Sequence, residues 1–434
     1  MLKRSMIAFL LICLLIPQTG CVLSFNEPEN LIAAPASNRE ELKERELVNS
    51  FLSHDEKIQV PHTMENAAPY FDIDIDHDGV AEKIVFWSKK NGFQAGISLL
   101  KKKDEKWSIY DKTTQSGKEI SYFNMLSLDN QEKLLFLGID VGPYKTLHIY
   151  RLTDSGFLVK DQLNYSQLEL VDIKNSGHYS LIAALNGTSE NLTCDVSMYE
   201  LDTAGSNSLK RTYYQTFRGF CQEMKFGQVA QGKQGLYLAM GNDSDYVDVS
   251  LLFYTGRSFY EQLHQSTSYS MSFLDSAMGI IKDIDGDGIL EILDTKAPTD
   301  ASKRSPRDFL QIWKRWDGNT NFQITYATID NRSDGYKLDI PVEWLSSLNY
   351  QYYITAGENQ LRIYDGSSGL SDAKPVFTIF TQERNEEAPD YGQLLGKSES
   401  KHKNFYVRFY NRTFHGKNIL FEDVQKGFAV KGGA

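Results

Sequence analysis

Apolar and polar residues alternate in short runs from about Pro69 to the C-terminus, with Gly, Asp, Asn and Ser between the runs. Alternation with a period of two is typical of β-strands, and long helical patterns are absent. The sequence therefore predicts an all-β fold. One apolar strand returns seven times at intervals of roughly 45 to 60 residues, as Ile97–Leu100, Leu147–Leu152, Val196–Leu201, Val249–Tyr254, Leu310–Trp313, Leu361–Tyr364 and Tyr406–Tyr410.

Each repeat has room for about four short strands, and a sheet of that size cannot bury both of its faces alone. Sheets packed around a common axis bury their faces and leave only short edges. We therefore expect a seven-bladed β-propeller over residues 66–434. A sandwich of two sheets is the alternative, although it would not explain the period.

The N-terminal segment has a different pattern. Lys3 and Arg4 precede an apolar run over residues 6–16, which is too short to span a bilayer as a lone helix. This order is typical of an export signal, so we expect residues 1–20 to be removed. Residues 21–65 are polar and irregular apart from one short helix that begins with a capping box at Ser37, and they are expected to form a tether.

The small residues before Cys21 resemble a bacterial lipobox, although Gln18 stands where that motif prefers Leu. The resemblance implies cleavage before Cys21 and a diacylglycerol group on its sulfur. Such a chain would be anchored at the outer face of the cytoplasmic membrane without spanning it. Ordinary signal cleavage without a lipid is the alternative.

The chain is acidic, with a formal net charge of −11, and loss of the signal makes it more negative by two. An acidic surface argues against nucleic-acid binding, which needs clustered Lys and Arg.

Two of the four cysteines, Cys194 and Cys221, lie in the body of the chain. Outside the cytoplasm they could form a disulfide; buried thiols are the alternative.

Two acidic loops share the spacing Asp-x-Asp-x-Asp-Gly-x-x-Glu. Carboxylates at loop positions 1, 3 and 5, the carbonyl at position 7 and the carboxylate at position 9 can surround one hard cation, and glycine at position 6 permits the turn. We expect two structural Ca²⁺ sites, held by Asp74, Asp76, Asp78, Val80 and Glu82 and by Asp283, Asp285, Asp287, Ile289 and Glu291. The alternatives are an EF-hand or dockerin-like site, which needs a carboxylate at position 12, and an acidic turn that binds Ca²⁺ only weakly.

With these loops in place, the repeats resemble the FG-GAP/VCBS family of integrin-type propellers, and the whole chain resembles the VCBS-repeat lipoproteins of Gram-positive bacteria. The resemblance implies a propeller, bound Ca²⁺ and an extracytoplasmic binding role. A third loop at Asp172 keeps the turn but has Lys174 at a ligand position, so we expect no metal there.

No catalytic motif stands out among the scattered histidines and many carboxylates. A basic stretch, with Lys296, Lys303, Arg304 and Arg307, is a candidate contact loop for a protein or an anionic cell-wall polysaccharide. We therefore expect a non-enzymatic binding or scaffold protein. The alternative is a carbohydrate-active hydrolase or lyase that uses the central funnel of the propeller.

Overall fold

The structure is a computed structural model that describes residues 37–63, 70–76, 78–128, 132–173, 177–201, 209–241, 246–270, 279–299, 309–355, 358–366, 374–384, 392–414 and 416–431. Within these ranges the predicted all-β fold is confirmed. The strands form six antiparallel sheets of four to six strands, and a further two strands form a small sheet of their own. The predicted signal and Cys21 lie outside the described residues.

Three sheets come from the first half of the chain. Sheet A contains β1 (Glu56–Ile58), β2 (Tyr70–Ile73), β3 (Glu82–Lys89), β4 (Gln94–Lys103), β5 (Lys106–Lys112) and β6 (Gln115–Ser116). Sheet B contains β7 (Glu119–Ser127), β8 (Lys133–Asp140), β9 (Lys145–Thr153) and β10 (Gly156–Tyr165). Sheet C contains β11 (Gln167–Val171), β12 (Ser180–Asn186), β13 (Thr193–Leu201) and β14 (Leu209–Arg218).

The remaining sheets follow in chain order, with one exception at the C-terminus. Sheet D contains β15 (Phe220–Ala230), β16 (Lys233–Gly241), β17 (Tyr246–Tyr254) and β18 (Phe259–Ser270). Sheet E contains β19 (Ile281–Lys282), β20 (Glu291–Lys296), β21 (Leu310–Trp316), β22 (Phe322–Asn331), β23 (Tyr336–Asp339) and the C-terminal β31 (Phe428–Val430). Sheet F contains β24 (Leu348–Thr355), β25 (Glu358–Asp365), β26 (Phe377–Glu383), β27 (Gln393–Ser398) and β28 (Lys403–Phe409), and β29 (Thr413–Phe414) pairs with β30 (Lys417–Asn418).

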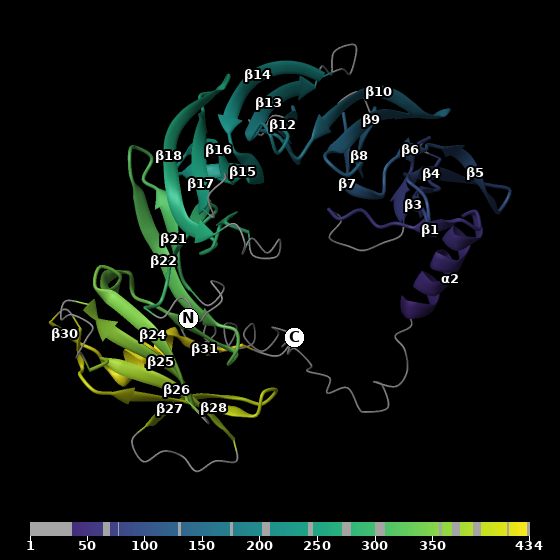
Figure 1. Ribbon diagram of the computed structural model, residues 1–434. Coiled ribbons are helices and arrows are strands. Elements are labelled where there is room, and N and C mark those ends of the chain that lie inside the picture. Colours follow the sequence, from purple (N-terminus) through teal and green to yellow (C-terminus); the bar gives the residue numbers. More distant parts are fainter. Residues whose placement is uncertain are drawn as a thin grey trace, which may run out of the picture.

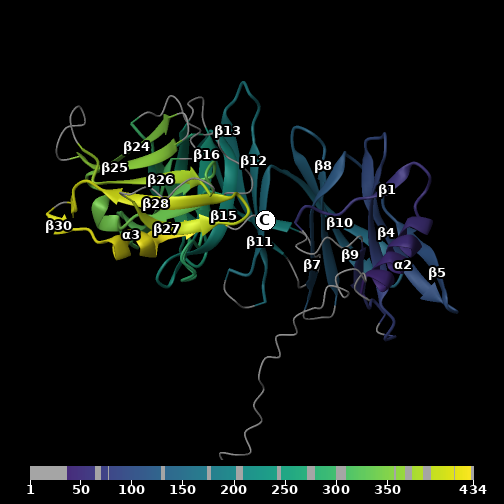
Figure 2. The same cartoon turned by 90° about the horizontal axis from the view of Figure 1, so that it is seen from below.

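The six sheets follow one another along an open arc, with sheet A at one end and sheet F at the other (Figure 1). The view from below places the helix α2 (Ser37–Ser50) and the helix α3 (Phe421–Gly427) at opposite ends of this arc (Figure 2). The C-terminal strand β31 pairs with β23 in sheet E, so the end of the chain returns to the preceding sheet and not to sheet A.

A hydrophobic core fills each space between consecutive sheets, and the strand pattern explains how. In β8, Leu135 and Leu137 belong to the core between sheets A and B. Leu134 and Phe136 belong to the core between sheets B and C. Because successive side chains point to opposite faces, a central strand buried on both sides reads as a continuous apolar run.

The seven strand instances of the sequence fall in six sheets, which corrects the expected count of one sheet per instance. The seventh instance overlaps β28, which pairs with β26 in sheet F, the sheet that also holds the sixth instance. Phe405 and Val407 of β28 are buried in the same core as Leu361 and Ile363 of β25. Sheet F therefore uses the last aromatic run as its fourth paired strand, in the order β24-β25-β26-β28-β27.

The predicted helix is confirmed as α2 and packs its apolar side onto sheet A. Val48 is fully buried with Val85 and Leu100, and Phe51 and Leu52 lie against the same cluster. This segment continues into β1, which pairs with β3.

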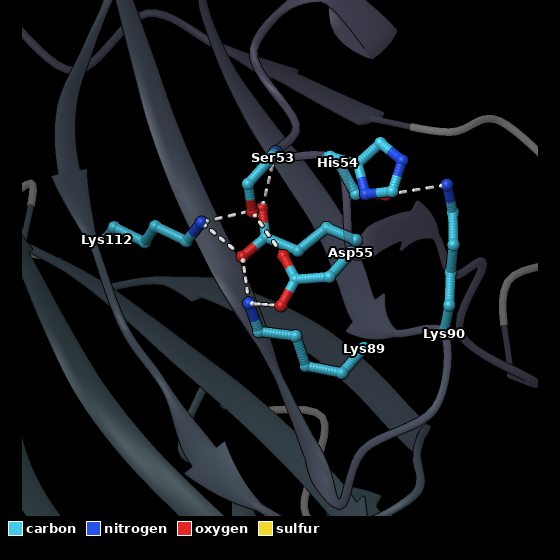
Figure 3. Close-up of polar contacts among 7 residues, drawn as sticks. Ser53, His54, Asp55, Lys89, Lys90 and Lys112 are labelled. Atoms are coloured by element: carbon cyan, nitrogen blue, oxygen red, sulfur yellow. Dashed lines mark hydrogen bonds and ion pairs between the residues drawn. The ribbon is translucent and has the colours of Figure 1, made fainter.

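Charged contacts fix the same segment (Figure 3). The carboxylate of Glu56 accepts hydrogen bonds from the Lys112 ammonium at 2.8 and 2.9 Å and from the Ser53 amide at 3.0 Å. Lys89 donates to Asp55 at 2.6 Å, and its ammonium lies 3.5 Å from Glu56. Burial alone would raise the pKa of Glu56, but these hydrogen bonds outweigh it and lower the pKa. Glu56 is therefore an ionised, buried anchor for the N-terminal segment.

Candidate metal centres

The first acidic loop joins β2 to β3 and brings three carboxylates together. Oxygen atoms of Asp74, Asp76 and Asp78 all lie within 4.8 Å of one another. The Gly79 amide donates to Asp74 Oδ2 at 3.2 Å, and Gly79 has a φ of +85°, which favours glycine. The Ile75 amide donates to Glu82 Oε2 at 2.9 Å. The spacing predicted from the sequence therefore does produce a turn with converging carboxylates.

The second loop, between β19 and β20, repeats this geometry. Oxygen atoms of Asp283, Asp285 and Glu291 lie within 4.8 Å of one another. The Gly288 amide donates to Asp283 Oδ2 at 2.8 Å with φ of +84°, and the Ile284 amide donates to Glu291 Oε2 at 3.0 Å. Equivalent hydrogen bonds at equivalent positions show that the two loops are one structural unit used twice.

Each loop contains a buried carboxylate oxygen with no hydrogen-bond partner. These atoms are Asp74 Oδ1 in the first loop and Glu291 Oε1 in the second. A buried anionic oxygen without a donor is costly, and a cation in the cage would remove that cost. The residues present therefore fit Ca²⁺, which prefers several carboxylate oxygens.

The pKa values of the position-9 glutamates indicate the same need for positive charge. Burial, with a smaller contribution from Asp76, raises the pKa of Glu82. Burial, together with Asp285, Asp287 and Asp283, raises the pKa of Glu291 to about 7. Both glutamates are thus held where protein groups alone do not compensate their charge.

The two donor sets are not identical. Glu82 lies outside the first converging group and Asp287 lies outside the second. Asp287 instead contacts the guanidinium of Arg315 on β21, and Asp76 lies 3.5 Å from Lys101 on β4. A cation on the neighbouring strand thus faces each loop.

The position-7 residues contribute a tight turn. The Val80 amide donates to Asp78 Oδ1 at 2.7 Å, and the Ile289 amide donates to Asp287 Oδ1 at 2.8 Å.

The alternative of an EF-hand is wrong, because strands follow both loops. The position-12 residues are also used elsewhere: Val85 is buried in a core, and Asp294 pairs with Lys314.

The third loop has the same turn at its ends. The Gly177 amide donates to Asp172 Oδ2 at 2.7 Å, and Gly177 has a φ of +78°, as in the two acidic loops. Lys174 lies outside the described residues, as does His77 of the first loop.

The other predicted site residues have different surroundings. Lys296 ends β20, and its ammonium donates to the Leu348 carbonyl of sheet F, so this residue joins two sheets. Lys303, Arg304 and Arg307 of the expected contact loop lie outside the described residues.

Cys194 and Cys221 are free, buried thiols in the core between sheets C and D. Hydrogen bonding with Cys194, followed by burial, raises the pKa of Cys221. Asn186 lies beside this pair: its side chain accepts from the Cys221 amide at 2.8 Å and donates to the Cys221 carbonyl at 3.1 Å. The disulfide stays a prediction, for two thiols that the fold brings into contact.

Sequence patterns missed a group of titratable side chains on the first strands of sheets C and D. Burial, with a contribution from Glu223, raises the pKa of Glu169 on β11 to about 7, and Lys225 on β15 lies 4.0 Å away. Glu223 accepts from the Ile280 amide at 2.6 Å, and burial raises its pKa as well. In the sequence, the feature that could have indicated this group is Glu169, an isolated acidic residue within an apolar strand.

A pocket of about 240 Å³ was also missed, between sheets C and D. It is lined by Ile173, His178, Tyr179, Ser180, Glu200, Leu201 and Tyr254. These residues come from the third loop and from three strands, so no local spacing marks them.

No protein-family model matches the chain, and no curated protein matches it. Among solved structures, a protein inferred to be a 6-phosphogluconolactonase from Bacteroides uniformis matches with 11% identity and a TM-score of 0.31, over 72% of this chain and 82% of that chain. An exo-β-1,3-galactanase from Phanerochaete chrysosporium matches with 10% identity and a TM-score of 0.30, over 78% and 82%. A Dyadobacter fermentans protein of unknown function has 9% identity and a TM-score of 0.28, over 82% and 99%. Similarity this weak carries no functional argument.

None of the helices in the described part of the chain has the length and hydrophobicity needed to cross a membrane.

Proposed function

We propose that the chain is a lipid-anchored, extracytoplasmic binding protein whose sheets form an open, propeller-like arc stiffened by two Ca²⁺ ions. The observation that carries the calcium part is the pair of buried, unpartnered oxygens, Asp74 Oδ1 and Glu291 Oε1, each next to converging carboxylates. The ions would be structural, because each cage directs its donors inward and tightens the turn that leads into a central strand.

The experiment for calcium is thermal unfolding of the chelated protein with Ca²⁺ added back. With a dissociation constant of about 0.1–1 mM and about 5 mM Ca²⁺, each site would contribute on the order of 1–2 kcal/mol. Asp283→Asn should remove one site and therefore reduce the calcium-dependent stabilisation of the whole protein by the contribution of that site. Asp172→Asn, at the same position of the third loop, is the matched control and should leave the titration unchanged.

No calcium-dependent stabilisation at these concentrations would contradict the proposal. So would an equal loss from Asp172→Asn and Asp283→Asn, because the third loop lacks the converging carboxylates.

The membrane part of the proposal depends on Cys21. Acylation there would place the chain in the detergent phase of a two-phase extraction, and Cys21→Ser should move it to the aqueous phase. A rigid body held near the membrane in this way would serve to contact another protein or a cell-wall polysaccharide. Recovery of Cys21→Ser in the detergent phase would exclude the lipid anchor.

A second candidate function, a carbohydrate-active hydrolase or lyase, is favoured by one observation. The carboxyl of Glu169 has a pKa of about 7 and interacts with Glu223, as expected of a paired acid and base. Glu223, however, already accepts a hydrogen bond from the Ile280 amide, and this contact gives Glu223 a structural role. Loss of glycan turnover in Glu169→Gln with an unchanged melting temperature would support the enzyme; absence of turnover in the parent protein would exclude it for the glycans tested.

A further inference from the structure

The pocket between sheets C and D combines aromatic rings with one carboxylate. Glu200 lies next to the end of β13 and Tyr254 ends β17, so the two side chains come from neighbouring sheets (Figure 1). Burial, and then Glu200, raises the pKa of Tyr254, which indicates that the carboxylate acts on this phenol. Ile173 and Leu201 provide apolar wall, and Tyr179 provides a second phenol ring.

The carboxylate in this pocket belongs to Glu200, an exposed residue of β13. Glu200 is exposed and makes no ion pair with the residues that the structure describes, although Lys210 is its cross-strand neighbour on β14. The ring of Tyr254 packs edge-on against Phe259, with 5.5 Å between the ring centroids, which fixes its orientation. The pocket therefore contains an aromatic ring in a fixed orientation, from Tyr254, and an exposed carboxylate, from Glu200.

At two other places in the chain, a lysine ammonium lies close to both a tyrosine ring and a carboxylate. Two lysines each lie over a tyrosine ring and beside an aspartate: Lys83 with Tyr70 and Asp72, and Lys337 with Tyr326 and Asp339. The ammonium is 3.9 Å from the ring centroid and 2.8 Å from the carboxylate in the first case, and 4.9 Å and 3.2 Å in the second. Ring and carboxylate together stabilise an ammonium by cation–π and Coulomb attraction.

We propose that the pocket lined by Tyr179, Glu200 and Tyr254 binds an alkylammonium group supplied by a ligand, in the place that a lysine takes in the two internal examples. Its volume of about 240 Å³ lies below the roughly 300–1,000 Å³ of pockets for drug-sized ligands, which suits one group of lysine side-chain size. The inference goes beyond the proposed function and does not depend on calcium, because none of these residues belongs to the two acidic loops.

The test is ligand-observed NMR on the whole mature chain with Nα-acetyl-L-lysine amide as the probe. Nα-acetyl-L-norleucine amide, which has a neutral side chain, is the matched ligand. We expect saturation transfer to the lysine probe and at least a five-fold weaker effect for the norleucine probe. n-Butylamine distinguishes the sources: binding as strong as the lysine probe indicates a free amine, and weaker binding indicates a lysine side chain of a partner protein.

Variants assign the effect to the pocket. Glu200→Gln keeps the shape and should weaken the lysine probe about ten-fold, whereas Tyr254→Leu should weaken it about three-fold, as expected for one exposed cation–π contact. Tyr254→Phe keeps the ring and should retain binding. Glu190→Gln, at an exposed carboxylate outside the pocket, is the control.

Three results would overturn the proposal: no saturation transfer to the lysine probe, equal binding of the two amides, or equal losses in Glu200→Gln and Glu190→Gln. Circular dichroism and melting of each variant show whether it is folded. Running the titration in Ca²⁺ and in chelator keeps failure of this inference separate from failure of the calcium proposal.

Discussion

Replacement of Glu56 by Gln tests whether charge anchors the N-terminal segment to sheet A. The Glu56 side chain is 3% exposed and accepts Lys112 twice, while Lys112 and Lys89 are 29% and 23% exposed. A hydrogen bond to a charged group contributes about 1.5–3 kcal/mol. Breaking a fully buried ion pair costs about 3–5 kcal/mol. The cost is smaller here, because the lysines are partly exposed and water can solvate their ammonium groups once the glutamate is replaced. We expect a cost of about 2 kcal/mol.

The assay is hydrogen exchange of the Gln59 amide, which donates to the Phe86 carbonyl at 3.0 Å next to β1. If the segment opens locally, a cost of about 2 kcal/mol accelerates this exchange about 30-fold. Asp55→Asn is the matched control, because Asp55 pairs with Lys89 but is 63% exposed. Water screens an exposed pair, so it adds little stability, and Asp55→Asn should exchange less than about five-fold faster than wild type.

The pH dependence provides a second check. The folded pKa of Glu56 is lowered from its ordinary value of 4.5, so its stabilisation is present above that value and is lost as the pH falls through the lowered folded pKa. The difference between wild type and Glu56→Gln should be constant from about pH 8 to 5 and shrink below about 4.5. Exchange within three-fold of wild type, or an equal effect of Asp55→Asn, would refute the reasoning.

Three further predictions concern stability. Because burial raises the folded pKa of Glu169 to about 7, this residue makes stability fall as the pH rises from about 5 to 8. In urea titrations, Glu169→Gln should have a smaller slope than the parent and be more stable at pH 8 by on the order of 2 kcal/mol; an unchanged slope would contradict this. Cys194 and Cys221 of exported protein should resist alkylation in urea until reduced, and reduction should cost about 3–4 kcal/mol; modification in urea without reductant would exclude the disulfide. Gly138→Ala would place Cβ 2.1 Å from the Tyr165 hydroxyl oxygen, so it should lower stability by about 1–3 kcal/mol in the same titrations, and a neutral effect would show that Tyr165 can move.

Features set by residues near one another in sequence were predicted well. The Asp and Gly spacings of the two acidic loops fix local hydrogen bonds, such as Gly79 to Asp74, and those bonds bring the carboxylates together. The helix after the tether and the alternation of the strands are local in the same sense. The calcium ions themselves stay a prediction.

Features set by pairing between distant segments were not predicted. The aromatic run in β28 has the pattern of another unit, yet its partner is β26, so the count of sheets differs. Lys296 ends a strand that lies against sheet F, so its ammonium joins two sheets, which its basic neighbours in sequence did not indicate. Glu169 and the pocket around Glu200 depend on side chains from different sheets, and a linear pattern holds no information about them.

The position of β31 has a consequence for how the molecule is made. Sheet E begins before sheet F along the chain, but its outermost strand is β31, which follows all of sheet F. When the chain is synthesised or exported from its N-terminal end, the strand Tyr336–Asp339 is an unpaired edge of sheet E until residues 428–430 emerge. A chain that stops before Phe428 would leave that edge unpaired, so sheet E is completed only after the strands of sheet F have been made.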